Sequence, residues 1–97
     1  MHPSKRKGSG FEREVVAFLQ ERGIAALKIP LSGAVSGFEG DIDCPVRGVD
    51  KKLECKRRRR FASLYGWLGA NYGLVLREDN NEALLVMRLS DWADLAK

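Results

Sequence analysis

Two short stretches decide the fold of this chain: LECK at residues 53–56, and GDID at residues 40–43 before it. Both read as strands that carry charged side chains. Because strand side chains alternate between two faces, Glu54 and Lys56 are expected to project from the same face. Asp41, on the preceding strand, brings a second carboxylate within reach. Two carboxylates and a lysine at one point suit a divalent cation and a phosphodiester better than a protein core.

An E-x-K pattern by itself favours a plainer interpretation, an exposed salt-bridging strand face that stabilises weakly. Asp41 adds weight to the metal interpretation, because Mg²⁺ usually takes one or two carboxylates together with water and substrate phosphate. Lys56 would then orient or help to deprotonate a water, or stabilise charge on the phosphate. Asp43 shares the strand face of Asp41. It is either a further ligand or, as the favoured interpretation, a peripheral charge or the partner of an arginine.

The pattern of apolar residues, turns and caps predicts an α/β chain with the element order α-β-β-β-α-β-β-α. The sheet is expected to be a mixed central sheet flanked by helices. The expected helices cover residues 9–22, 60–70 and 90–97, and the expected strands cover 24–29, 41–46, 51–57, 73–77 and 83–89. Residues 31–40 are rich in glycine and serine and read as a loop.

Glu12 lies on the apolar side of the first expected helix, nearer the centre of its stripe than Glu14 does. A carboxylate there needs a reason, because burial of charge is costly. One reason is structural, since Ser9 and Glu12 fit a capping box at the helix start. The other is service in the metal site. Helix geometry alone leaves these two equally open.

With 97 residues and 44% hydrophobic composition, the chain reads as a single domain over 8–97 after a flexible basic tail over 1–7. The net charge is +4, and the positive charge is concentrated in basic clusters around residues 5–7, 51–52 and 56–60. Such clusters favour a polyanionic partner. No apolar run approaches a membrane span, and no signal peptide is apparent. We therefore expect no membrane partner and a cytoplasmic location, or the host cytoplasm if the source is viral.

The two cysteines, Cys44 and Cys55, fit no metal-binding spacing. We expect two reduced, inward-facing thiols, although a disulfide between neighbouring strands is conceivable. Four aromatic residues at helical or near-helical spacing favour packing in the core or in a dimer over stacking on bases; they are Phe61, Tyr65, Trp67 and Tyr72.

Three motifs in order, KGSGFERE at residues 7–14, Gly40-Asp41 and the E-C-K of residues 54–56, resemble those of the PD-(D/E)xK nuclease superfamily. Within it they most resemble the archaeal and viral Holliday junction resolvases, and the resemblance covers roughly residues 5–60. Cys55 replaces the usual aliphatic residue between the glutamate and the lysine. The chain also ends sooner after its final helix than many relatives do, which puts their dimer contacts in doubt here.

The resemblance implies a restriction-endonuclease-like core and a role for each matching position. Glu12 would be the helix-borne catalytic acid, Asp41 and Glu54 metal ligands, and Lys56 the catalytic lysine. The backbone carbonyl of Cys55 would complete the metal shell. A functional serine is expected in the loop before the aspartate, where Ser32 is preferred to Ser36. The implied DNA contacts come from two basic segments, namely Lys5, Arg6, Lys7 and Arg13, and Arg57, Arg58, Arg59 and Arg60.

The sequence therefore predicts an endodeoxyribonuclease that needs Mg²⁺, for which Mn²⁺ can substitute. It is expected to act as a homodimer on four-way or other branched DNA, since two sites about a twofold axis could cut two strands of a symmetric junction. One alternative is a repair, restriction-like or exonucleolytic enzyme with the same chemistry. Another is a DNA-binding module without catalysis, which the presence of Asp41, Glu54 and Lys56 argues against.

Overall fold

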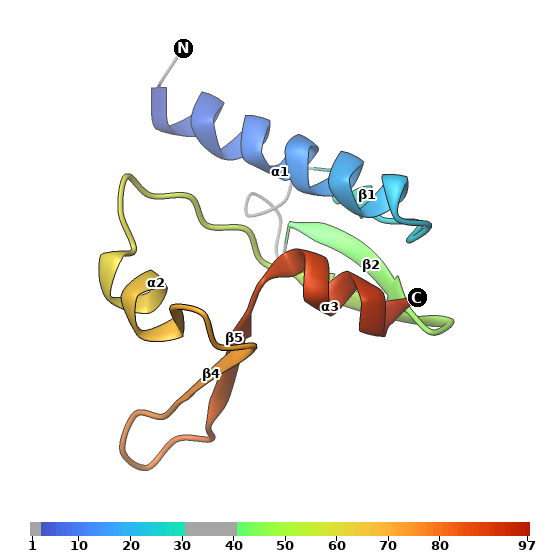
Figure 1. Ribbon diagram of the computed structural model, residues 1–97. Helices are drawn as coiled ribbons and strands as arrows, with labels where there is room; N and C mark the ends of the chain where they lie inside the picture. The colour runs from blue at the N-terminus through green and yellow to red at the C-terminus, as the bar shows by residue number, and fades with distance from the viewer. Residues whose placement is uncertain (1–2, 31–40) are drawn as a thin grey trace. The chain divides into compact units, whose positions relative to one another are not determined.

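Three helices and five short strands make up the chain in a computed structural model, which describes residues 3–30 and 41–97, with only the backbone for 3–9 (Figure 1). The elements are α1 (Pro3–Glu21), β1 (Leu27–Lys28), β2 (Ile42–Val46), β3 (Val49–Leu53), α2 (Ala62–Leu68), β4 (Gly73–Leu76), β5 (Leu84–Met87) and α3 (Leu89–Ala96). They divide into a first unit, Met1–Arg57 with Ala96–Lys97, and a second unit, Arg58–Leu95. The chain is thus a mixed α/β protein.

The first unit contains an antiparallel sheet in the order β1-β2-β3. A two-residue turn joins β2 to β3, and both of its residues have positive φ, 51° at Arg47 and 85° at Gly48. Such a turn follows the right-handed twist of its strands and pins their register. The register runs from Val46 opposite Val49 to Ile42 opposite Leu53. This hairpin fixes which residues meet at its open end.

The core of the first unit lies between α1 and the sheet (Figure 1). Leu19, Ile42 and Cys44 are fully buried. Ile42 and Cys44 alternate with Asp43, so one face of β2 is apolar and the other carries charge. The helix ends at a Schellman motif, in which Gly23 has a φ of 85° and Ile24 N–H donates to Leu19 O. That turn returns the chain to the sheet as β1.

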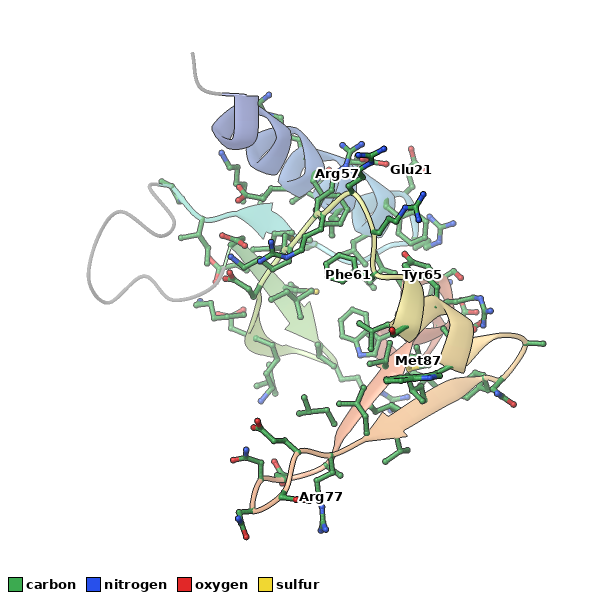
Figure 2. All side chains as sticks on the ribbon, turned by 90° about the vertical axis from the view of Figure 1, so that its left-hand side faces the viewer. Glu21, Arg57, Phe61, Tyr65, Arg77 and Met87 are labelled. Atoms are coloured by element: carbon green, nitrogen blue, oxygen red, sulfur yellow. The ribbon has the colours of Figure 1, made fainter. Side chains whose placement is uncertain are left out.

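The second unit consists of α2, the β4–β5 hairpin and most of α3. β4 and β5 pair antiparallel, with Val75 opposite Leu85 on one face of the hairpin. Both side chains are largely exposed, 69% and 60% respectively. Figure 2 marks Tyr65 on α2 and Met87 on β5 within this unit. Among the residues described, no helix has the length and apolar character needed to cross a membrane.

Several expectations about the elements are wrong. The described strands form two separate antiparallel sheets rather than one mixed sheet. The helix begins at Pro3 rather than at the predicted capping box, and β1 is only two residues long. β3 ends at Leu53, so the E-C-K segment follows the strand instead of lying within it. The single domain over 8–97 and the flexible tail over 1–7 stay predictions.

The aromatic residues divide between two environments. Phe61 is half-buried, whereas Tyr65, Trp67 and Tyr72 are exposed. Packing of the last three in this chain's own core is therefore wrong, and contact with a partner chain or with bases stays open. Both cysteines are free thiols, and Cys44 is fully buried while Cys55 is half-buried.

Candidate active site

Asp41 joins the segments that meet at the open end of the β2–β3 hairpin. Its N–H donates to Leu53 O at 2.7 Å, and its carbonyl accepts from Ile29 N–H at 3.0 Å. Its side-chain Oδ2 accepts from the backbone N–H of Cys55 at 2.7 Å. Three hydrogen bonds therefore place this carboxylate between the chain that follows β1 and the chain that follows β3.

Glu12 brings a second carboxylate to Asp41 from α1. Its side chain is only 14% exposed, and Lys28 Nζ on β1 lies 3.6 Å from its Oε2. Burial raises the pKa of Glu12 above its usual range, and the negative charge of Asp41 raises it further, whereas Lys28 lowers it. The two carboxylates are thus close enough to repel each other. Because α1 begins at Pro3, Ser9 is inside the helix and the capping role of Glu12 is wrong.

The pKa of the Cys55 thiol is affected by a third carboxylate, that of Glu54. Burial raises the pKa of Cys55 from 9.0 to about 11, and the charges of Asp41, Glu12 and Glu54 add to the rise. Each negative charge disfavours the thiolate, and the effect falls with distance. Glu12, Asp41 and Glu54 therefore all lie near Cys55, although they come from three separate segments of the chain.

Glu54 and Lys56 lie together on the exposed side of this group. Lys56 Nζ is 3.5 Å from Glu54 Oε2, and their side chains are 68% and 55% exposed. An ion pair so open to water stabilises the fold little. Both side chains are accessible to a large substrate, and the amino group of Lys56 lies beside the carboxylate of Glu54.

Neighbouring carboxylates repel one another, and the same oxygen atoms are suitable ligands for a hard cation. Mg²⁺ prefers oxygen ligands and retains several waters, so one or two carboxylates are enough for it. A divalent charge would also relieve the repulsion that raises the pKa of Glu12. In the residues that the structure describes, no three Asp, Glu, His or Cys side chains form a ready metal site. The arrangement fits a cation held by Glu12 and Asp41, with Glu54 at the rim.

The remaining predicted residues are either described by their own contacts and exposure or lie outside the described residues. Asp43 forms an ion pair with Lys52 across the hairpin, which fits the peripheral role. Arg13 is exposed on α1, and Arg57–Arg60 are exposed on the irregular segment after β3, where Figure 2 marks Arg57. Ser32 and Ser36 lie outside the described residues, as do the side chains of Lys5, Arg6 and Lys7.

Lys28 is the site residue that sequence reasoning missed. It interrupts the apolar run of residues 24–29, which was a signal that this position has a polar partner. Its closeness to Glu12 follows from the packing of α1 against β1. That packing joins residues far apart in the sequence, so local pattern could not reveal it.

Comparison with known proteins agrees with this arrangement. The sequence model of the archaeal Holliday junction resolvase (Hjc) family matches residues 3–65, well over half of the chain. The match contains Glu12, Asp41, Glu54 and Lys56. No curated protein and no solved structure gives a significant match. The chain therefore belongs to the archaeal Holliday junction resolvase family, which is of the PD-(D/E)xK nuclease type.

Proposed function

We propose that this protein is a Mg²⁺-dependent Holliday junction resolvase that hydrolyses phosphodiesters in four-way DNA. The observation that carries the proposal is the gathering of Glu12, Asp41 and Glu54 around Cys55, with Lys56 beside Glu54. The fold itself gains nothing from three negative charges near one another, because like charges repel. A cation and a phosphate give that arrangement a use.

Each side chain has a task that follows from its position. Glu12 and Asp41 would hold the cation, and Glu54 and the carbonyl of Cys55 would complete its shell. When bound, Mg²⁺ would lower the pKa of a coordinated water and offset negative charge on the phosphate. Asp41 is oriented by its bond from Cys55 N–H, so this ligand is held in place before substrate arrives.

Lys56 acts on the substrate side. Its ammonium stands next to Glu54 and is exposed, so it would neutralise charge that develops on the phosphate or orient the attacking water. In hydrolysis the water oxygen bonds to phosphorus while the bond to the leaving oxygen breaks. The water gives up a proton, and the leaving oxygen takes one up. This site needs only positioned charge and a proton acceptor, which the carboxylates can supply.

DNA recognition is proposed to rest on charge and shape. Arg57–Arg60 follow the site directly and are exposed. They would contact phosphates on the arms beside the cleaved bond, and phosphate contacts position a duplex without reading its sequence. A homodimer would present two such sites to a symmetric junction. The exposed pair of Val75 and Leu85 supports association with a second chain, since apolar side chains grouped on a surface favour burial in an interface.

A cleavage panel tests the proposal. Labelled four-way junctions, flaps, nicked duplexes and intact duplexes are incubated with Mg²⁺, with Mn²⁺ and with EDTA. We expect paired nicks in the four-way junction with either metal and none in EDTA. Cleavage of flaps or duplex ends in preference to junctions would favour a repair or exonucleolytic enzyme. Metal-independent junction binding with no cleavage of any substrate would favour a DNA-binding module.

A further inference from the structure

The ammonium group of Lys28 stands beside the carboxylate of Glu12 but has no place in the proposed chemistry. We propose that Lys28 is a built-in counter-ion of the Glu12–Asp41 pair, which holds the pair together before a divalent cation binds and opposes the cation when it arrives. This inference rests on the proposed function only in its second half. The first half concerns the metal-free protein.

The geometry of the first unit supports a fixed counter-ion. Lys28 Nζ is 3.6 Å from Glu12 Oε2, and Glu12 is mostly buried while Lys28 is 40% exposed. The next residue, Ile29, donates its N–H to the carbonyl of Asp41. The side chain of Lys28 therefore contacts Glu12, while the residue after it is hydrogen-bonded to the backbone of Asp41. The backbone that carries this ammonium is held by the pairing of β1 with β2.

Charge at this place decides the direction of both effects. Two carboxylates that face each other at low exposure are unfavourable without a cation, so removing Lys28 leaves their repulsion uncompensated. The same positive charge repels a divalent cation bound to Glu12. Even at a water-like dielectric, charges about 4 Å apart interact measurably, and the second charge of the cation doubles the effect. Lys28 should therefore stabilise the metal-free fold and weaken cation binding.

Three variants and two measurements test this. Lys28→Met removes the charge but keeps an apolar stem, and Lys28→Arg keeps the charge. Lys51→Met makes the same change of net charge at an exposed lysine of β3. Thermal unfolding is measured in EDTA, and Ca²⁺ binding is measured by calorimetry, so neither readout depends on cleavage.

We expect Lys28→Met to lower the melting temperature in EDTA by about 2–5 °C and to tighten Ca²⁺ binding by roughly tenfold. Lys28→Arg should behave like the wild type, and Lys51→Met should change neither quantity appreciably. An unchanged melting temperature, or weaker Ca²⁺ binding in Lys28→Met, would overturn the proposal.

A double-mutant cycle in EDTA separates this inference from the proposed function. Lys28→Met, Glu12→Gln and their combination are compared, and the loss caused by Lys28→Met should vanish once Glu12 is neutral. If neither the wild type nor any variant binds Ca²⁺, the metal-dependent function fails while this cycle still decides the counter-ion. A loss from Lys28→Met that persists in the Glu12→Gln background would show that Lys28 acts elsewhere.

Discussion

The Cys55 thiol provides a way to detect the carboxylate group without DNA or metal. Its pKa is raised to about 11 by burial and by Asp41, Glu12 and Glu54. Since thiols react as thiolates, a rise of two pKa units from 9.0 lowers the reactive fraction near pH 8 by about a hundredfold. Alkylation of Cys55 should therefore be at least that much slower than alkylation of an ordinary exposed thiol.

The contribution of charge is separated from that of burial by Asp41→Asn. Of the three charges, that of Asp41 has the largest effect on the pKa of Cys55. The asparagine side-chain oxygen can still accept the hydrogen bond from Cys55 N–H. The substitution should speed alkylation roughly threefold to tenfold, which corresponds to a partial pKa unit up to one unit. Glu14→Gln, at an exposed position of α1, is the matched control and should leave the rate unchanged.

The assay is iodoacetamide labelling between pH 7 and pH 10.5 followed by tryptic peptide mapping. Trypsin isolates Cys55 in the peptide of residues 53–56, whereas Cys44 falls in a different peptide, so the two thiols are read separately. A Cys55 profile that levels off near pH 9 would refute the reasoning. An Asp41→Asn rate equal to the wild-type rate would show that the carboxylates do not gather around Cys55.

Three other predictions concern stability and DNA binding. Because the pKa of Glu12 is raised in the folded state, protonated Glu12 stabilises the fold at low pH, and this stabilisation is lost as pH rises through the folded-state pKa. Glu12→Gln should therefore change the free energy of unfolding more favourably at pH 7 than at pH 4, which chemical denaturation at both pH values would show. Gly48→Ala should destabilise the fold by about 1 kcal/mol because φ is 85° there. Gly10→Ala should stabilise the fold by about 0.5–1 kcal/mol, because Gly10 lies inside α1 with open space around it. Equal effects of the two substitutions in thermal unfolding would contradict this prediction. Arg58→Gln and Arg59→Gln should each reduce the slope of log affinity against log salt by about one, as fluorescence anisotropy with a four-way junction would measure, and an unchanged slope would remove them from the DNA interface.

Local pattern was a good guide to the hairpin and to Glu12. Cys44 was predicted to face inward, and it is fully buried. The position of Glu12 near the apolar stripe predicted a carboxylate on the buried side of the helix, where the structure places it. These features depend on strand alternation and helix periodicity, which the sequence expresses directly.

The end of β3 depends on pairing that the sequence does not express. The alternation of residues 51–57 continues past Leu53, but the last backbone pair is Ile42 with Leu53. Beyond it, the carboxylate of Asp41 rather than a neighbouring backbone carbonyl accepts the N–H of Cys55. A side chain thus replaces the strand ladder where the candidate site begins. Likewise, the position of Lys28 and the separation into two sheets follow from contacts between distant segments.

The most direct test of the central claim is the rate of four-way junction cleavage by the wild type and Lys56→Ala, with junction affinity measured in Ca²⁺. We predict that Lys56→Ala lowers the Mg²⁺-dependent rate by at least about a hundredfold and leaves affinity within a few-fold of the wild type. Undiminished cleavage by Lys56→Ala would contradict the assignment of this carboxylate and lysine group as the nuclease site.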